Sequence, residues 1–565
     1  MRPFRVWSIV PHPLDGEGYV SPDRASRLVF GKDPVCMQFN PGAFKPSPST
    51  GGLGGDGVSP GRLYSAKKKP ARPWYTAIRY GCTTLLAAFA LTLAACSEPP
   101  PSASEVPVAL LHPPLTPLLE DLEQRTFKYF WETSDRPNAL VPDRYPYNEP
   151  FSSIAAVGFG LTAYAVGVER GWITREQARE RTLTTLRFFA TAPQGPDATG
   201  KAGHNGFFYH FLELDSGTRY ASWVELSSVD TALLLAGVLF AQTYYDRDEP
   251  PEAEIRILAD AIYARADWPW LQVRKPLLSM GWFPESGFIP HDWQGYNEAM
   301  LVYILALGSP THPIGDDGWA AWTRNYDRAW GEYQKQEYLG FGPLFGHQYS
   351  HVWIDFRGIR DDYMRRRGLD YFENSRRATY AQRNYAIANP MRWKGYGENV
   401  WGLTESDGPQ AAQQLFEGQS REFRHYSARG AGIADAFDDG TIAPTAAVAS
   451  LPFAPEIVMP AIEEMHRRYG HEIYSKYGFL DAFNPSFSYE TPLKTGRIVP
   501  ELGWVASDYI GIDQGPIVAM IANYRDGFVW EVMRRNPYVR RGLMRAGFRG
   551  GWLDEGPQPR PAPRR

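Results

Sequence analysis

The chain has 565 residues, of which 43% are hydrophobic and 14% are aromatic, and its formal net charge at pH 7 is −4. The hydrophobic content suffices for a large core, whereas the balanced charge excludes the basic face that a nucleic-acid partner requires. The three cysteines, Cys36, Cys82 and Cys96, all precede residue 97. Disulfides, thiolate metal sites and cysteine nucleophiles are therefore excluded from the rest of the chain.

The first 96 residues contain a candidate export signal. Residues 1–66 are rich in Gly, Pro and Ser, which predicts a disordered segment or a start assigned too far upstream. Residues 67–96 combine a basic start with an apolar run too short to span a bilayer. Their end, Leu-Ala-Ala-Cys, resembles a bacterial lipoprotein signal cleaved before a lipidated Cys96, and an ordinary secretory signal is the alternative. We expect an exported protein that is periplasmic or anchored to the outer membrane.

Two polar segments flank the region with hydrophobic periodicity. Residues 97–115 are rich in proline and predict a flexible tether. Residues 552–565 are rich in Pro and Arg and are expected to be disordered. Between them, residues 116–551 show apolar positions at helical spacing.

Apolar and amphipathic helical segments alternate along residues 116–551. Residues 152–168 are small and apolar on nearly every side, as in an inner helix, and Thr174 opens a capping box that begins an amphipathic helix ending near Ala190. Further helices are predicted over residues 227–245, 252–266, 298–307, 319–338, 361–388, 445–451, 455–469, 515–524 and 528–535.

Paired helices joined by long aromatic-rich and acidic connections predict an all-α fold. We expect a single (α/α)6 barrel over residues 116–551, with minor short strands such as residues 206–212. Six inner helices would surround a pocket that the connections complete. A helical solenoid is the alternative, but no fixed repeat period supports it.

Residues 281–299 crowd aromatic rings, a histidine and carboxylates between two helical segments. Ring faces pack on sugar C–H faces, while carboxylates accept hydroxyl hydrogen bonds and move protons. Glu298 precedes an apolar run, which predicts a place in the first turn of a buried helix, where an acid also complements the helix dipole. The candidate substrate contacts here are Trp282, Glu285, His291, Trp293 and Tyr296.

Three other stretches carry similar residue types. Glu225 and Asp230 lie near a predicted inner-helix start beside Trp223, although Asp230 could simply favour the helix dipole. The remaining candidate residues of the pocket are Tyr349, Arg357, Tyr396, Glu398, Trp401 and Glu405.

His347, His351 and Asp355 recur at i, i+4 and i+8, which on one helix would form a metal-binding stripe. The chain has no HExxH motif, and the aromatic neighbours favour sugar contact or buried hydrogen bonding instead. We therefore predict no metal and no cofactor, and assign these three residues to substrate binding.

Five stretches together resemble the glycoamylase-like family, glycoside hydrolase family 144. They include GYGENVWGLTESDGP and GIDQGPIVAMIANYR, and occupy residues 281–313, 342–390, 395–409, 438–461 and 511–525. The resemblance implies an (α/α)6 barrel that hydrolyses β-1,2-glucan internally to sophoro-oligosaccharides, with anomeric inversion and without a cofactor.

The resemblance also implies roles for individual carboxylates. Glu298, in the motif YNEAM, would be the proton donor, with Glu225 and Asp230 as further carboxylates of the pocket. The base of an inverting enzyme lies roughly 6.5–9.5 Å from the acid, or acts through a water relay. Its identity stays open among Glu398, Glu405, Asp355 and Asp230.

Other functions fit the same residues. A β-1,2-glucan transglycosylase would elongate or cyclise chains, and a non-catalytic glucan-binding lipoprotein would bind without turnover. The expected partner in each case is a β-glucan, with no nucleic acid, membrane contact only through the lipid anchor, and a monomeric state. The β-1,2 linkage follows from the resemblance alone.

Overall fold

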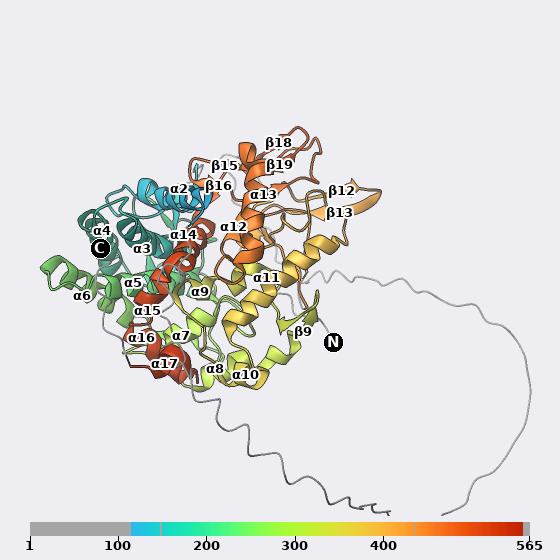
Figure 1. Ribbon diagram of the computed structural model, residues 1–565. Coiled ribbons are helices and arrows are strands. Elements are labelled where there is room, and N and C mark those ends of the chain that lie inside the picture. Colours follow the sequence, from blue (N-terminus) through green and yellow to red (C-terminus); the bar gives the residue numbers. More distant parts are fainter. Residues whose placement is uncertain (1–114, 147–149, 434–435, 557–565) are drawn as a thin grey trace, which may run out of the picture. The chain divides into compact units, whose positions relative to one another are not determined.

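The longest apolar stretches of the chain form helices that are buried on all sides. In α3 (Ile154–Glu169) every residue up to Gly167 is buried, and α7 (Met300–Gly308) is buried throughout. A helix that is apolar all round belongs inside a protein. Figure 1 shows α3 and α7, together with α5 (Ser228–Tyr244) and α14 (Gly511–Asp526), between helices that cover the outside.

The computed structural model describes residues 115–146, 150–433 and 436–556. The other α-helices are α2 (Pro117–Thr133), α4 (Arg175–Thr191), α6 (Pro250–Ala264), α8 (Asp317–Trp322), α9 (Tyr349–Trp353), α10 (Asp362–Arg367), α11 (Tyr371–Ala388), α12 (Pro444–Val448), α13 (Pro455–Ile473), α15 (Phe528–Met533), α16 (Pro537–Arg545) and α17 (Gly551–Asp554). Three 3-10 helices are η1 (Trp268–Leu271), η2 (Thr323–Arg328) and η3 (Leu344–His347).

The strands are short and lie in the connections between helices. They are β1 (Arg144–Tyr145), β2 (Phe151–Ser153), β3 (Gly203–His204), β4 (Phe207–Tyr209), β5 (Phe211–Glu213), β6 (Leu226–Ser227), β7 (Gly281–Phe283), β8 (Gly287–Phe288), β9 (Trp330–Tyr333), β10 (Gln336–Leu339), β11 (Glu405–Ser406), β12 (Ala412–Phe416), β13 (Gln419–Phe423), β14 (Ser427–Ala428), β15 (Tyr474–Ser475), β16 (Gly478–Phe479), β17 (Phe483–Asn484), β18 (Arg497–Val499), β19 (Gly503–Val505) and β20 (Tyr509–Ile510).

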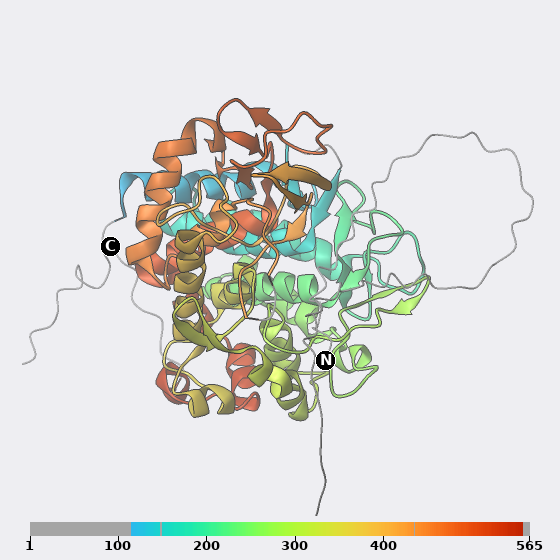
Figure 2. The same cartoon turned by 90° about the vertical axis from the view of Figure 1, so that its right-hand side faces the viewer.

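The prediction of an all-α fold is wrong. Among the described residues, β3, β4, β6, β7 and β8 form a five-stranded antiparallel sheet, and β17, β19 and β18 form a three-stranded one. Further strands pair two by two, and Figure 2 faces the side that carries the hairpin β12–β13. Helices and sheets both build this fold, so a plain (α/α)6 barrel does not describe it.

Two glycines bring the inner helices α3 and α5 into direct backbone contact. A Cβ on Gly158 would lie 2.3 Å from the carbonyl oxygen of Leu233, and one on Gly237 would lie 2.1 Å from that of Gly158. These spaces are too small for any side chain, so a larger residue would push the helices apart. The contact fixes the start of α5 relative to the start of α3, and both starts contribute to the pocket described below.

The outer helix α4 begins with the predicted capping box. Thr174 Oγ1 accepts a hydrogen bond from the Gln177 amide at 3.1 Å, and Gln177 Oε1 accepts one from the Thr174 amide at 2.8 Å. Both donors would otherwise lack a partner at the helix start. Arg175 then joins α4 to α6 through a 2.7 Å ion pair with Glu252.

Several predicted helices differ in extent. The helix expected over residues 298–307 begins at Met300, so Glu298 lies in the turn before it. The helix expected over residues 319–338 is α8 and η2 followed by the β9–β10 hairpin, which turns at Gln334 and Lys335 with positive φ. The helix expected over residues 361–388 is interrupted at Gly368, whose φ of 72° ends α10.

None of the described helices is both long and apolar enough to cross a bilayer. The predicted signal, the lipidated Cys96 and most of the tether lie outside the described residues.

Candidate active site

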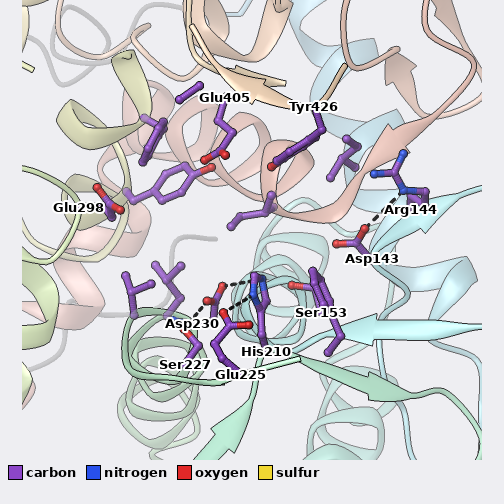
Figure 3. Close-up of a pocket in the computed structure, with 18 of the residues that line it drawn as sticks. Asp143, Arg144, Ser153, His210, Glu225, Ser227, Asp230, Glu298, Glu405 and Tyr426 are labelled. Atoms are coloured by element: carbon purple, nitrogen blue, oxygen red, sulfur yellow. Dashed lines mark hydrogen bonds and ion pairs between the residues drawn. The ribbon is translucent and has the colours of Figure 1, made fainter. Parts of the chain in front are cut away.

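A pocket opens among the inner helices and the strands that connect them, and Figure 3 shows its lining. Five of its residues carry carboxylates and two carry cationic groups, while aromatic and aliphatic side chains cover the remainder. The lining comprises Asp143, Arg144, Ser153, His210, Phe211, Glu225, Ser227, Val229, Asp230, Leu233, Trp293, Glu298, Phe341, Phe345, Tyr349, Glu405, Tyr426, Ala428, Ile510 and Ile512.

The floor of the pocket is built by β6 and the first turn of α5. Alternate residues of a strand point to one face, so Glu225 and Ser227 share a side. Ser227 is also the N-cap of α5, where its Oγ accepts from the Asp230 amide at 3.2 Å and lies 2.5 Å from Asp230 Oδ2. The sheet and the helix start thus place two carboxylates next to each other.

His210, between β4 and β5, bridges these two carboxylates. Its Nδ1 lies 2.9 Å from Glu225 Oε1 and its Nε2 lies 3.4 Å from Asp230 Oδ1. Burial alone would lower the pKa of His210, but Asp230 and Glu225 raise it to about 9. The imidazole is therefore a cation at neutral pH.

These three side chains also meet the residue types of a metal site, since their ligand atoms lie within 4.8 Å of one another. The carboxylates, however, face different ring nitrogens. A metal ion takes a neutral imidazole through one nitrogen, whereas here both nitrogens are positioned to donate to carboxylates. The donor set fits an ion-paired imidazolium better than a metal centre.

Glu298 reaches the pocket from the turn before α7. Its backbone is held on both sides, because Ser350 Oγ donates to the Glu298 carbonyl at 3.2 Å and Asn297 Oδ1 accepts from the Ala299 amide at 3.0 Å. Its Oε2 is buried and makes no hydrogen bond within the protein. Burial raises the pKa of Glu298 to about 8, and the nearby charges of Glu405 and Asp230 act in the same direction. Glu298 is therefore a protonated carboxylic acid at neutral pH.

The opposite wall carries Glu405, Tyr349 and Tyr426. Figure 3 shows the Glu405 carboxylate and the Tyr426 ring entering from the side that faces His210 and Asp230. Burial raises the pKa of both tyrosines well above the ordinary value, so they are neutral hydroxyl groups. They can hydrogen-bond a polar ligand without adding charge.

Arg144 anchors the acidic side of the pocket. It lies 3.1 Å from Asp407 Oδ2, 3.0 Å from Asp508 Oδ2 and 3.5 Å from Asp143 Oδ2. Behind this group, Asp481 Oδ2 accepts from the Asp407 amide at 2.7 Å. Burial raises the pKa of Asp481 to about 7, and the charge of Asp407 acts in the same direction. Burial also raises the pKa of Asp513 well above its ordinary value, and the charge of Asp481 adds to that rise.

The pocket includes six of the residues predicted from the sequence: Glu225, Asp230, Trp293, Glu298, Tyr349 and Glu405. Three of them were proposed as catalytic and three as substrate contacts. Trp293 is buried, and its Nε1 donates to Ser228 Oγ at 2.8 Å. Their roles remain predictions, but their position in one pocket is a result of the fold.

Two candidates for the catalytic base lie elsewhere. Glu398 has an exposed side chain, paired with Arg383 at 2.5 Å. Asp355 is buried in ion pairs with Arg357 and Arg534. Neither is among the residues that line the pocket.

His347 and His351 are also buried away from the pocket, and burial lowers the pKa of each to about 3. His347 lies 3.1 Å from the hydroxyl of Tyr296, another predicted contact, and His351 lies 3.1 Å from Ser375 Oγ. They are neutral core histidines in this structure.

The remaining predicted contacts do not line the pocket either. Trp223 packs against Phe151 and Phe211, and Trp282 against Trp270. Tyr396 donates to Asp438 at 2.7 Å, and Glu285 pairs with Arg219 at 2.7 Å. Of the others, Trp401 is buried, while His291 and Arg357 are exposed.

Sequence reasoning missed six charged or polar residues of the pocket, namely Asp143, Arg144, Ser153, His210, Ser227 and Tyr426. Asp143 precedes the two-residue strand β1 and Arg144 begins it, in a segment without a motif, and Tyr426 lies between the hairpin β12–β13 and β14. His210 had a usable signal, because it interrupts the apolar strand-like run of residues 206–212, where a charged group needs a partner.

Known proteins of similar sequence include members of one family of glycoside hydrolases. The family model Glycoamylase, described as "Putative glucoamylase", matches residues 290–537. The chain is 29% identical over 458 residues to an exo β-1,2-glucooligosaccharide sophorohydrolase from Parabacteroides distasonis. That alignment covers 76% of this chain, and the chain spans only 57% of the relative's length.

Two solved structures align over most of their own length. A "putative glucoamylase" from Bacteroides uniformis is 32% identical, with a TM-score of 0.65, 77% of this chain covered and 98% of that one. An endo-β-1,2-glucanase from Chitinophaga pinensis, solved with sophorotriose and glucose, is 28% identical, with the same TM-score and the same shares covered. The chain therefore belongs to the glycoamylase-like family, glycoside hydrolase family 144.

Proposed function

We propose that this protein is a glycoside hydrolase that cleaves β-1,2-glucan internally to sophoro-oligosaccharides, with inversion at the anomeric carbon. The observation that carries the proposal is Glu298, an acid whose buried Oε2 has no partner within the protein and whose pKa is raised to about 8. The names of the relatives from Parabacteroides distasonis and Chitinophaga pinensis support β-1,2-glucan as the substrate.

Glu298 is suited to be the general acid. Cleavage of a glycosidic bond needs a proton on the leaving oxygen, and an acid that stays protonated at neutral pH can supply it. An ordinary surface glutamate would be ionised at that pH. The desolvated position of Glu298 thus provides the protonation state that the first step requires.

For the base, the pocket favours Glu405 over Asp230. Both oxygens of Asp230 are engaged, one near His210 and the other near Ser227. Glu405 enters the pocket from the side that faces His210 and Asp230, as Figure 3 shows. An inverting mechanism needs such a second carboxylate to activate a water molecule. We assign the water-activating role to Glu405 and substrate positioning to Asp230 and Glu225.

Internal cleavage is part of this proposal because the Chitinophaga pinensis relative is an endo-β-1,2-glucanase. The Parabacteroides distasonis relative is an exo enzyme, so the length of the products has to distinguish the two modes of action.

We further propose that the protein is exported and anchored through a lipid on Cys96, as the lipobox-like residues 93–96 indicate. Expression in a bacterial host followed by membrane fractionation tests this. The protein should follow the membrane fraction, and Cys96→Ser should release it. A Cys96→Ser variant that still fractionates with the membrane would contradict the lipid anchor.

The activity is tested by incubating the full chain with linear β-1,2-glucan, with starch and with β-1,3-glucan. We expect short sophoro-oligosaccharides of mixed length from the first substrate only, and the α-anomer as the first product by proton NMR. Longer or cyclic products would indicate a transglycosylase. Binding without product would indicate a glucan-binding protein.

The base is tested separately with Glu405→Gln and Asp230→Asn. In Glu405→Gln, added azide should form a glycosyl azide and restore part of the turnover, because a small anion can replace the activated water. Rescue of Asp230→Asn instead would move the role to Asp230.

A further inference from the structure

The imidazole of His210 faces a carboxylate oxygen with each of its two ring nitrogens. The distances are 2.9 Å from Nδ1 to Glu225 Oε1 and 3.4 Å from Nε2 to Asp230 Oδ1. An ionised carboxylate can only accept hydrogen bonds, so both ring nitrogens must carry a proton for both contacts to be favourable. A neutral tautomer would set a lone pair against one of the two carboxylates.

The surroundings hold the ring in this orientation. The His210 amide donates to the Glu225 carbonyl at 2.9 Å, and the His210 carbonyl accepts from the Ile154 amide at 3.2 Å. The imidazole also stacks on Phe211, with ring centroids 3.9 Å apart and planes inclined by 17°. The backbone hydrogen bonds and the stacking on Phe211 thus fix the imidazole between the two carboxylates.

We propose that His210 is a positioning residue: the hydrogen bond of its Nδ1 with Glu225 and the ion pair of its Nε2 with Asp230 hold both carboxylates in place as acceptors for sugar hydroxyl groups on the pocket floor. This inference rests on the proposed function only in taking the ligand to be a sugar. The bridging geometry itself does not depend on the substrate.

Charge supports the same picture. Three carboxylates act on His210, namely Asp230, Glu225 and Asp143, and Asp143 is itself 3.5 Å from Arg144. Burial opposes the charge on the ring, but the carboxylates outweigh it and raise the pKa of His210 to about 9. The positive charge of the ring lies between Glu225 and Asp230 and offsets the repulsion between these two neighbouring carboxylates.

The protonation state of His210 can be measured without any substrate. The full chain labelled with 15N-histidine would be observed by NMR between pH 6 and 10, with His210→Gln used to assign the signal. We expect both ring nitrogens of His210 to be protonated at pH 7.5, with a midpoint near pH 9. A neutral ring at pH 7.5 would overturn the inference while leaving the proposed hydrolysis untouched.

The positioning role is tested by the kinetics of His210→Gln. We expect kcat/KM on β-1,2-glucan to fall at least tenfold, mainly through a rise in KM, because the carboxylates that accept the sugar hydroxyl groups lose their fixed position. The matched control is His204→Gln, a half-buried histidine outside the pocket that packs on Trp270 and Trp282. Thermal unfolding of each variant would confirm that it folds.

The outcomes separate the two proposals. A folded His210→Gln enzyme with unchanged KM would overturn the positioning role, even if the wild type hydrolyses β-1,2-glucan. A wild type that neither cleaves nor binds β-1,2-glucan would overturn the proposed function, and with it the sugar ligand of this inference.

Discussion

Two groups of histidines and carboxylates in this protein have opposite electrostatic character. In the pocket, His210 touches Glu225 and Asp230, and its pKa is raised to about 9. In the core, His347 and His351 have no carboxylate within contact distance among the described residues, and burial lowers the pKa of each to about 3. The first group is charged at neutral pH and the second is neutral.

The difference comes from the partners rather than from burial, since all three histidines are shielded from water. His347 and His351 are within hydrogen-bonding distance of uncharged hydroxyl groups. The nearby Asp355 forms ion pairs with Arg357 and Arg534 instead. His210 instead has one acid on each ring nitrogen. The partners of a histidine therefore cannot be predicted from its near neighbours in the sequence, because Glu225 and Asp230 lie 15 and 20 residues after His210.

The largest effect is expected in the charged group of the pocket, where Glu298 is the proposed general acid. Glu298→Gln removes the transferable proton but keeps the size and polarity of the side chain. We expect kcat on β-1,2-glucan to fall by roughly 10³-fold while KM changes little, because general acid catalysis contributes about 10²–10⁴-fold. The measurement is initial reducing-sugar release at pH 7.

The matched control is Glu398→Gln, because Glu398 is exposed and pairs only with Arg383 among the contacts found. It should keep nearly full activity. If Glu298→Gln retained more than a tenth of wild-type kcat, the acid would have to be sought elsewhere in the pocket.

In the core group of His347, His351 and Asp355, we expect a substitution to reduce the stability of the fold. Asp355 is buried between Arg357 and Arg534, and Asp355→Asn leaves both cations without their acid. Breaking a buried ion pair typically costs about 3–5 kcal/mol, and part of this is recovered here because both arginines reach solvent. We expect the free energy of unfolding in urea to fall by about 2–3 kcal/mol, with kcat per folded molecule unchanged.

Asp362→Asn is the corresponding control. Asp362 is highly exposed and pairs with Arg365, so its loss should change stability by less than about 1 kcal/mol. Loss of catalytic activity in folded Asp355→Asn would mean that the core group communicates with the pocket.

Local sequence patterns were sufficient to predict most helices and part of the site. The capping box at Thr174 and the apolar runs of α3, α5 and α7 are signals contained within one segment. Glu225, Asp230 and Glu298 were found because each lies next to such a helix start. That the three belong to one pocket was implied by the family resemblance and not by the local signals, and the structure places all three in the same pocket. Their roles remain predictions.

What the sequence did not show depends on contacts between distant segments. The strands are two to five residues long, and a strand such as β6 exists only because β4 and β7 pair with it. The stripe of His347, His351 and Asp355 assumed one continuous helix, whereas η3 ends at His347 and α9 ends at Trp353. Arg144 forms ion pairs with Asp407 and Asp508, which are more than 250 residues away in the sequence, so no local pattern predicts these contacts.

A smaller effect is expected in the pH dependence of stability, with opposite signs for the two groups. His347 and His351 have pKa values near 3 when folded, below the ordinary 6.5, so the unfolded chain binds more protons and stability is lost as pH falls below about 6.5. His210 has a raised pKa, so its contribution is full below pH 6.5 and is lost as pH rises through about 9.

Urea unfolding between pH 5 and 9 measures both contributions. Between pH 6.5 and 5, the His351→Phe variant should lose about 1–2 kcal/mol less unfolding free energy than the wild type. This figure follows from about 1.4 kcal/mol per pH unit for one histidine. In His210→Gln, the change between pH 7 and 9 should shrink instead. Parallel curves for these two variants would contradict the assignment of opposite charge states.

The smallest expected effect is that of a chelator. A metal would need a neutral His210, but both of its ring nitrogens are directed at carboxylates, and in the core group Asp355 already binds two arginines. Dialysis against EDTA should therefore leave kcat/KM within twofold, and added Zn²⁺ or Ca²⁺ should not raise it. If activity were lost and then restored by one divalent ion, the floor of the pocket would be a metal site and the imidazolium bridge would be wrong, because the same carboxylate oxygens cannot serve both.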